Sequence, residues 1–543
     1  MLQSALDGFD YDWLVIGSGF GGSVSALRLG EKGYKVGVLE QGCRYRDEDF
    51  PKSTWNFRKF NWVPGFGMRG TLQVTAFKDV FIASGVGVGG GSLVYANTLY
   101  RAADAFYQNP QWADMGDWKS ELAPHYDTAE KMLGVQEVPR GSVGQELLKE
   151  VGRHFGVEDP FRRTPCGVFF GESGETVPDP YFGGEGPDRT GCIFCGECVQ
   201  GCRVGAKNTL MKNYLWFAEK KGVEIHPERQ VVDIHPLGAE DGSGGYRVST
   251  QRPGAWFKKQ PREYRARGIV FSAGALGTNS LLAQCKLNES LPRISDKLGD
   301  LVRTNSESIL AVTMPRGTED IWNDVTISAS VHPRPDTHIE FNTFGRNADA
   351  MSLFYTIITG PGNRLTRPLK WLGQVIRHPI RFLQTLWPVG WSERSVVWLV
   401  MQSLDNAIAF RAKRGLFGGV KLTTEQDPHK PNPTYIEIAN EAAQFLADKH
   451  DGIAQSMILE ALRNAPTTAH ILGGAVIADT PDHGVVDRNS KVFGYRNMMI
   501  CDGSTVPGNT GVNPSLTITA MSELAMSKVP EATDNWWQED SGT

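Results

Sequence analysis

The chain has 543 residues, far more than one ordinary domain, so we expect two or more packed units. Its content of 40% hydrophobic and 22% charged residues is ordinary for a soluble globular protein. The net charge of −5 gives no electrostatic reason to expect nucleic acid, and that class of partner is excluded. Glycine, at 61 residues, exceeds its usual share of about 7%, which favours tight turns and close backbone approaches.

The N-terminus and the cysteines bear on the compartment. Residues up to Asp12 include acids and the first apolar run is short, so no signal peptide is predicted. No stretch approaches the roughly 20 apolar residues of a membrane-spanning helix. The eight cysteines do not suggest a disulfide scaffold, because four of them fall within eleven residues. We therefore expect a cytoplasmic protein.

The first predicted unit is a strand, a glycine turn, a helix and a second strand. Residues 11–16 are apolar and β-prone, which predicts a buried strand, and the glycines of 17–22 have the spacing G-x-G-x-x-G. A helix follows up to Lys32, and residues 35–39 form the second strand, which ends at Glu40. A dinucleotide-binding motif requires this context.

Each position in this unit has a physical role in binding a nucleotide. Gly17 permits the tight turn, Gly19 lets a pyrophosphate approach, and Gly22 lets helix and strand pack. The N-terminus of the helix, at Phe20, offers free N–H groups to phosphates, and Glu40 can accept from ribose hydroxyls. The motif alone does not separate NAD from FAD.

A second glycine-rich segment, residues 85–97, favours FAD. Its three consecutive glycines precede an apolar run, which suggests backbone held against a flat ligand or a pyrophosphate. The alternative, a flexible loop, fits these apolar residues poorly. A third segment, residues 268–278, predicts a buried strand that runs into a glycine-rich helix start. We expect it beside the first unit in the same sheet.

Four cysteines follow the C-x-x-C-x-x-C-x-x-x-C ligand spacing of bacterial ferredoxins: Cys192, Cys195, Cys198 and Cys202. Gly196 and Gly201 ease a tight loop that turns the thiolates toward one centre, and we expect a [4Fe-4S] cluster there. In the ferredoxin pattern Pro follows the fourth cysteine, whereas Arg203 follows here, so Cys166 is an alternative fourth ligand. A structural zinc site is the second candidate. Disulfides are a third, less favoured in a reducing compartment.

Residues 363–392 combine basic and aromatic side chains and predict two short amphipathic helices. Pro368 and Pro379 both suit helix starts. Four apolar residues fall on one helical face: Leu365, Leu369, Leu372 and Ile376. Helices at a membrane interface would explain this composition. A lid packed on the substrate domain, with a solvated basic rim, explains it equally well.

The C-terminal segment predicts another ligand-facing surface. His470 is followed by two glycines in the pattern His-x-x-Gly-Gly, and a strand over 498–501 ends in Asp502-Gly503. An acid and a backbone N–H there can meet the ribityl–phosphate region of a flavin. Asn513-Pro514 opens an apolar helix whose first backbone donors can face the carbonyl edge of the flavin. The polar tail from Glu531 predicts a frayed terminus.

Together, the three glycine segments, the His-x-x-Gly-Gly and the Asp-Gly-Ser…Asn-Pro-x-Leu-Thr-Ile-Thr-Ala tract resemble the glucose–methanol–choline (GMC) oxidoreductases, and their bacterial cholesterol-oxidase-like branch most closely. The resemblance is strong at both ends of the chain and weak from about 310 to 460. It implies an α/β fold, with a Rossmann-like FAD-binding domain and an inserted α+β substrate domain. The FAD-binding domain is expected over 10–100, 203–306 and 468–530. The substrate domain is expected over 101–202 and 307–467, including the cysteine loop and residues 363–392.

The resemblance also implies roles for particular residues. In that family a His and an Asn flank the flavin ring, and the matching positions are His470 and Asn513. The implied chemistry is oxidation of an alcohol, in which a base takes the hydroxyl proton as hydride passes to the flavin. An unperturbed His pKa of about 6.5 suits a base near neutral pH. A loop histidine with an ordinary hydrogen bond is the alternative interpretation of His470.

The match is incomplete at two points. Tyr95 stands where sterol oxidases carry an Asn in the second glycine motif, so contacts near the flavin are expected to differ. The active-site Glu of those enzymes has no clear counterpart, and Glu340 is only a candidate. The predicted cofactor-binding residues are Gly17, Gly19, Phe20, Gly22, Glu40, Gly90, Gly91, Ser92, Asn97, Val231, Ala273, Asp502, Gly503, Asn513 and Pro514.

The predicted function is FAD-dependent oxidation of a sterol or another bulky lipophilic alcohol. An Fe–S cluster would give electrons a path to a protein or a quinone, which favours a dehydrogenase over an oxidase. One alternative is an oxygen-using, cholesterol-oxidase-like enzyme with a structural zinc. Another is a non-catalytic flavin protein that relays electrons. Peripheral contact with a membrane fits the segment 363–392.

Overall fold

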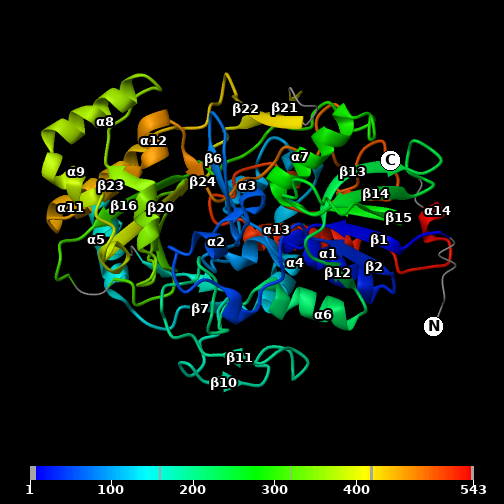
Figure 1. Cartoon of the computed structure of the whole chain (residues 1–543), viewed down its shortest axis with the longest axis horizontal. Helices are drawn as coiled ribbons and strands as arrows, with labels where there is room; N and C mark the ends of the chain where they lie inside the picture. The colour runs from blue at the N-terminus through cyan, green and yellow to red at the C-terminus, as the bar shows by residue number, and fades with distance from the viewer. Residues whose placement is uncertain (1–7, 158–160, 319–320, 416–419, 540–543) are drawn as a thin grey trace.

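The computed structural model describes residues 8–157, 161–318, 321–415 and 420–539. Figure 1 shows two lobes side by side along the longest axis of the molecule, each built around its own sheet. The nucleotide lobe holds β1 and its neighbours at the right of the view. The substrate lobe holds β16, β20 and β23 at the left.

The sheet of the nucleotide lobe is mostly parallel at its centre. Its strands run in the order β12 (Glu224–His226), β2 (Val36–Leu39), β1 (Tyr11–Ile16), β15 (Arg262–Phe271), β14 (Tyr246–Gln251) and β13 (Gln230–Pro236). β25 (Met498–Ile500) also pairs with β15, in parallel. The predicted strand over 11–16 is confirmed, and so is the place of the third glycine segment beside it. Because β1 and β2 are buried along their whole length, they are apolar without alternation.

Helices cover this sheet. α1 (Phe20–Glu31) packs against α6 (Tyr214–Lys220) and against α13 (Ser515–Ser527), which also packs on α4 (Trp118–Leu133). α13 is buried along most of its length between these neighbours, and its buried Glu523 pairs with Arg28 of α1 at 2.8 Å. α7 (Gly274–Leu287) follows β15, as the third glycine segment predicts.

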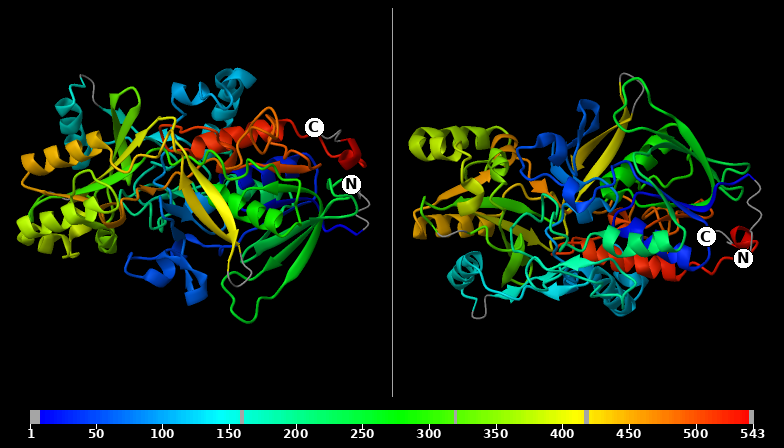
Figure 2. Two further views of the ribbon diagram at one scale, coloured as in Figure 1. Left: turned by 90° about the horizontal axis from the view of Figure 1, so that it is seen from above. Right: turned by 60° about the horizontal axis from the view of Figure 1, so that its bottom comes forward.

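The sheet of the substrate lobe is antiparallel. Its order is β19 (Tyr355–Ile357), β23 (Ile453–Met457), β16 (Ser308–Thr313), β20 (Ser395–Gln402), β18 (Thr337–Asn342), β17 (Ile327–Arg334) and β8 (Arg162–Arg163). α5 (Val143–His154) and α11 (Glu437–Lys449) pack on it and complete one hydrophobic core. The hairpin of β21 (Ile408–Arg414) and β22 (Val420–Gln426) extends across α7 of the nucleotide lobe (Figure 2). The predicted domain boundaries stay a prediction.

Short elements complete the fold. The strands are β3 (Trp62–Val63), β4 (Met68–Arg69), β5 (Leu72–Ala76), β6 (Phe81–Gly85), β7 (Gln136–Glu137), β9 (Pro165–Cys166), β10 (Thr176–Val177), β11 (Arg189–Thr190) and β24 (Thr467–Thr468). The short helices are α2 (Phe57–Phe60), α3 (Asp104–Tyr107), α8 (Thr366–Arg377), α9 (Pro379–Thr385), α10 (Trp391–Arg394), α12 (Ile458–Arg463) and α14 (Trp536–Glu539).

The two amphipathic helices predicted within 363–392 are present as α8 and α9, at the upper left of Figure 1. Their apolar stripe faces solvent, with Leu365 80% exposed and Ile376 72% exposed. The lid interpretation requires this stripe to pack on the substrate lobe, and it does not. No helix in the described part of the chain is both long and apolar enough to cross a bilayer.

The prediction of a frayed tail is wrong as far as residue 539. Trp536 is buried, and its ring stacks on that of Trp13, with 4.9 Å between the centroids. The N–H of Ala532 donates to the carbonyl of Lys32 at 2.9 Å. The prediction was based on the polar residues around Trp536 and overlooked the packing of this indole on the nucleotide lobe.

Candidate active site

His470 lies between β24 and β25 and is bound to a buried carboxylate. Its Nδ1 pairs with Oε1 of Glu307, and the backbone N–H of Ala469 donates to Oε2 of the same carboxylate at 2.8 Å. Burial lowers the pKa of His470, but the charge and hydrogen bond of Glu307 outweigh it, so the pKa lies above its usual value of 6.5. A carboxylate at Nδ1 selects the tautomer that leaves Nε2 free to accept a proton.

Asn513 joins this pair to a second carboxyl group. Its Nδ2 donates to Oε2 of Glu340 at 3.2 Å and lies 3.4 Å from Nε2 of His470. Oδ1 of Asn513 and Oε1 of Glu340 are buried, and neither has a hydrogen-bond partner among the described residues. Buried polar atoms of this kind call for a ligand or water. The structure therefore brings His470, Asn513 and the candidate Glu340 to one point.

Glu340 sits on β18 in a fully buried position. Burial raises the pKa of Glu340 to about 8, against smaller lowering effects of Asn513 and His470. His338, two residues earlier on the same strand, has its Nε2 3.8 Å from Oε1 of Glu340, and burial holds its pKa well below the usual value. At neutral pH the carboxyl of Glu340 is mostly protonated.

Sequence reasoning missed Glu307 and His338. Glu307 stands just before β16 with no motif around it, and His338 lies in an ordinary strand pattern. Their relevance comes only from the residues that they contact in space.

The two N-terminal glycine segments pack backbone against backbone. Gly17 has φ of +101°, and a Cβ there would collide with the carbonyl of Ser272. Gly90 has φ of +51°, and a Cβ there would lie 2.6 Å from the Cα of Gly19. The hydroxyl of Ser18 accepts from the N–H of Gly89 at 3.1 Å. Side chains are thus excluded where the two turns meet.

The predicted nucleotide-binding residues follow neighbouring strands at one edge of the sheet. Gly17, Gly19, Phe20 and Gly22 follow β1, Glu40 follows β2, Ala273 follows β15, and Asp502 and Gly503 follow β25. Because these strands are parallel, their carboxyl ends share one edge, where such folds bind dinucleotides. Pro514 precedes α13, and Val231 lies on β13, after a turn in which Arg229 N–H donates to the carbonyl of Glu40 at 2.8 Å.

Several of these residues form hydrogen bonds within the protein. Glu40 accepts from Ser18 N–H at 3.1 Å and from Gly42 N–H at 2.8 Å. Asp502 accepts from Gly274 N–H at 2.9 Å, and the hydroxyl of Ser92 donates to the carbonyl of Gly89 at 2.7 Å. These bonds hold the loops that form the edge, and direct contacts of the same residues with a cofactor stay a prediction.

Asn97 tests the fit of FAD to this edge. It is fully buried with φ of +70°, and neither Nδ2 nor Oδ1 has a hydrogen-bond partner in the described part of the chain. A buried amide left without any partner is costly, so a polar ligand is the natural complement. With Gly90 and Gly91 seven and six residues earlier, the residues present fit a bound dinucleotide.

The four cysteines gather around one small cavity of about 20 Å³, but the structure does not support a metal site. Within the described ranges, no group of three or more His, Cys, Asp or Glu side chains is arranged to hold a metal, and Cys192, Cys195, Cys198, Cys202 and Cys166 are all free. Burial raises the pKa of Cys195 to about 12, so with no metal beside it this thiol is neutral. Cys166 is buried, with its Sγ 3.6 Å from the carbonyl of Ile327.

The cysteine loop instead packs around a lysine. The ammonium of Lys207 donates to the carbonyls of Cys198 at 2.8 Å, Tyr95 at 2.8 Å and Leu93 at 3.0 Å. These bonds tie the loop to the second glycine segment. The predicted Fe–S cluster and its zinc alternative are thus unsupported. The prediction of a dehydrogenase was based on the cluster and loses that support.

Comparisons with known proteins agree with the site. A family model described as GMC oxidoreductase matches residues 418–522. A cholesterol oxidase of Acinetobacter baumannii is 45% identical, over 97% of this chain and 95% of its own. A cholesterol oxidase of Mycobacterium tuberculosis is 46% identical, over 96% of this chain and 91% of its own.

Solved structures show the same fold. The crystal structure of pyridoxine 4-oxidase from Mesorbium loti has a TM-score of 0.62 at 14% identity, covering 95% of this chain and 98% of that one. A fungal aryl-alcohol oxidase has a TM-score of 0.60 at 13% identity, with the same coverage. The predicted α/β fold, a Rossmann-like FAD-binding unit with a substrate unit, is confirmed. Given nearly full-length relatives at 45–46% identity, the chain belongs to the GMC oxidoreductase family.

Proposed function

We propose that the protein oxidises a sterol or another bulky lipophilic alcohol with the help of FAD. The observation that carries the proposal is the meeting of His470, Glu340 and Asn513, where two buried polar atoms have no hydrogen-bond partner among the described residues. Relatives at 45–46% identity are cholesterol oxidases, which supports a sterol as the substrate.

His470 is the proposed base. Its Nε2 accepts the hydroxyl proton of the substrate, while Glu307 holds Nδ1 and stabilises the imidazolium that forms. Nδ2 of Asn513, 3.4 Å from Nε2, orients the substrate oxygen toward the imidazole. When bound, FAD supplies the acceptor for the hydride that leaves the carbinol carbon.

Glu340 has a different proposed role because of its environment. With a pKa of about 8 it is mostly neutral at pH 7, and a neutral carboxyl can donate a hydrogen bond from Oε1 to the substrate oxygen. As a neutral group it serves as a hydrogen-bond donor, and the proton of the alcohol passes to Nε2 of His470, whose pKa is raised by Glu307.

We further propose O₂ as the electron acceptor, in place of a protein or quinone. The overall reaction then balances as alcohol plus O₂ giving ketone plus H₂O₂. The names of the relatives support an oxidase, and the unsupported metal site removes the argument for a relay.

A bleaching experiment tests both proposals. Purified protein loaded with FAD is mixed with cholesterol in detergent without oxygen, and the yellow flavin absorbance is expected to disappear. Admitting air should restore the colour and give one H₂O₂ for each ketone. No bleaching with any sterol or long-chain alcohol contradicts the substrate class. Bleaching that air does not reverse contradicts O₂ and favours a dehydrogenase.

A specific observation also favours a lipid surface as a partner. We define the α8–α9 face as the exposed apolar residues Leu365, Leu369, Leu372, Ile376, Ile380, Leu383, Leu386, Trp387 and Val389. From residue 350 to residue 392 the sequence contains no Asp or Glu, and Lys370, Arg377 and Arg381 are exposed around the face. Apolar residues with basic flanks are typical of helices that lie in the surface of an anionic bilayer.

Hydrogen bonds and an ion pair on the inner side of α8 keep the α8–α9 face directed toward solvent. The guanidinium of Arg367 is fully buried and paired with Glu460 at 2.6 Å, and the indole of Trp371 donates to Thr356 at 3.0 Å. Because the inward side is fixed by polar bonds, the helices do not turn their apolar side inward. We propose that the α8–α9 face docks on anionic bilayers.

Vesicle sedimentation measures this docking. We expect the protein to pellet with vesicles of phosphatidylglycerol and phosphatidylcholine, and much less with phosphatidylcholine alone. A Leu369→Glu/Ile376→Glu variant should bind at least about tenfold more weakly, since burying one such side chain contributes roughly 1.5–3 kcal/mol. Leu462→Glu, at an exposed position of α12 outside the α8–α9 face, serves as the control. Equal vesicle binding by the double variant contradicts the lipid partner. So does a wild-type protein that binds no vesicles but forms a dimer that the double variant abolishes.

A further inference from the structure

One face of the segment 303–307 holds the loop of His470. Glu307 pairs with the imidazole, and the backbones of Arg303 and Leu472 exchange two hydrogen bonds of 2.8 and 2.9 Å. The hydroxyl of Thr468 donates to the carbonyl of Thr304 at 3.0 Å. The position of His470 therefore depends on this segment both through its side chain and through its backbone.

The other face of the same segment holds the loop of Asn513, and Asn305 makes most of the bonds. Its Nδ2 donates to the carbonyl of Val512 at 3.0 Å, and its Oδ1 accepts from the N–H of Gly511 at 3.0 Å. Its own N–H donates to Oδ1 of Asn509 at 2.8 Å. Because Val512 directly precedes Asn513, one amide side chain fixes the two residues that lead into the site.

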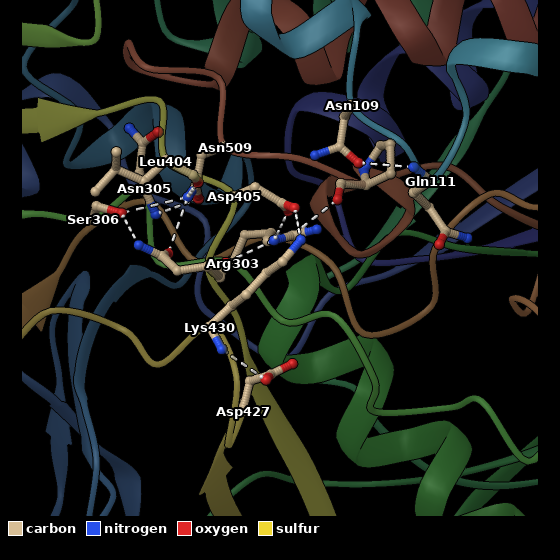
Figure 3. A network of polar contacts seen from close by, with 12 residues as sticks. Asn109, Gln111, Arg303, Asn305, Ser306, Leu404, Asp405, Asp427, Lys430 and Asn509 are labelled. Carbon is tan, nitrogen blue, oxygen red and sulfur yellow. Dashed lines mark hydrogen bonds and ion pairs between the residues drawn. The ribbon is translucent and has the colours of Figure 1, made fainter.

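A third segment, residues 404–406, closes the network. Nδ2 of Asn509 donates to the carbonyl of Leu404 at 2.6 Å, and Nη1 of Arg303 donates to Asp405 at 2.9 Å. Nε of Arg303 donates to the carbonyl of Pro507 at 3.0 Å. Figure 3 shows these side chains meeting around Arg303 and Asn305. Arg303 and Asn305 are both buried, so water does not compete for these bonds.

The backbone of the segment is constrained in an unusual way. Asn305 has φ of +58° and Ser306 has φ of +46°, in the left-handed region that few side chains adopt. Asn tolerates this region better than most residues and also offers one donor and one acceptor group. Asp lacks the N–H donor, and Gly lacks the side chain. Only Asn combines the backbone conformation with both hydrogen bonds.

We propose that Asn305 is a positioning residue that sets Asn513 relative to His470. The inference rests on the proposed function of these two residues. Asn305 touches neither substrate nor cofactor. It acts through the loop of Gly511 and Val512, while Glu307, two residues further along, fixes the imidazole.

Two variants separate this role from a general loss of structure. Asn305→Gly keeps the backbone conformation and removes both bonds. Asn305→Asp keeps the shape, but its carboxylate repels the carbonyl of Val512. In each variant we expect kcat per bound flavin to fall by about 10- to 100-fold, because a misplacement of about 1 Å costs on that order, with KM changed less than threefold.

The pH dependence gives a sharper readout. A protonated Asp restores a donor for Val512 and an acceptor for Gly511, so it mimics Asn. The ratio of kcat in Asn305→Asp to kcat in Asn305→Gly should therefore rise at least threefold as the pH falls from 9 to 6. Asn440→Asp is the control, since Asn440 is a buried Asn of α11 that donates to the carbonyl of Ile436 at 2.9 Å. It should leave kcat unchanged at each pH.

A second measurement needs no alcohol. The affinity of the bound flavin for sulfite responds to the groups that surround the ring, and we expect it to change at least threefold in both Asn305 variants but not in Asn440→Asp. An unchanged sulfite affinity, or a kcat within threefold of the wild type in both Asn305 variants, overturns the positioning role. A wild-type protein that oxidises no alcohol overturns the proposed function instead, and the sulfite result then judges Asn305 separately.

Discussion

Replacing His470 with glutamine slows anaerobic bleaching of the flavin by a factor of about 10²–10⁴, the usual contribution of a general base. Glutamine fills a similar volume and can still hydrogen-bond to Glu307, but it cannot accept a proton at neutral pH. Stopped-flow absorbance of the flavin with saturating alcohol measures the rate. Because the hydrogen bonds of His470 within the described part of the chain go to Thr468, Glu307 and Asn513 and not to the glycine turns, the content of bound flavin should not change.

The control for this experiment is His483→Gln, since that imidazole is 67% exposed and contacts the side chains of Asp479 and Thr480, away from the site. It should bleach at the wild-type rate. A His470→Gln protein that bleaches within tenfold of the wild type contradicts the role of base and transfers it to another group, with Glu340 the nearest candidate.

Replacing Glu340 with glutamine is expected to stabilise the protein in alkaline solution. Burial raises the pKa of Glu340 from 4.5 to about 8 in the folded state, so the folded protein holds this proton more tightly than the unfolded chain. The resulting stability is fully present below about pH 4.5 and is lost as the pH rises through 8. At pH 9 the loss amounts to about 5 kcal/mol, at 1.36 kcal/mol for each unit of pKa.

Thermal unfolding at several pH values measures this effect. The Tm of Glu340→Gln should exceed that of the wild type by at least about 3 °C at pH 9, and the difference should vanish near pH 4.5. Glu441→Gln, on the exposed side of α11, is the control and should show no such dependence. A difference that is constant with pH would mean that Glu340 is ionised in the folded protein.

The nucleotide half of the site could be predicted because local backbone geometry determines its residues. Gly17 and Gly90 occupy places where a Cβ collides with neighbouring backbone, and glycine spacing records such constraints directly. The strand, turn and helix around Gly17 follow one another within a short stretch of chain. A pattern of this kind is visible without any knowledge of distant partners.

The chemical half of the site depends on contacts between residues far apart in the chain. Glu307 and His470 are 163 residues apart, and Glu340 and Asn513 are 173 apart. No local pattern marks either carboxylate, so one was missed and the other was only a candidate. His470 and Asn513 were found through the family resemblance, and their roles stay proposals.

The cysteine motif shows the limit of spacing as evidence. The spacing of Cys192 to Cys202 does bring the thiols around one cavity, with Gly196 at φ of +68° and Gly201 at +104° in the turns that were expected. Ligation also requires the side chains to converge, and in the described part of the chain no group of three or more His, Cys, Asp or Glu is placed to hold a metal. Lys207, which the motif does not include, organises the loop instead.

The two carboxyl groups that contact His470 and Asn513 both come from residues 307–467, whereas His470 and Asn513 lie outside that stretch. Recombination among relatives that exchanges this stretch as a block would therefore transfer Glu307 and Glu340 along with the surface that meets the substrate. A chimera made in this way inherits its proton chemistry, as well as its specificity, from the donor of the substrate lobe. If this block is exchanged to obtain a new specificity, we expect the pH optimum of the chimera to follow that of the donor.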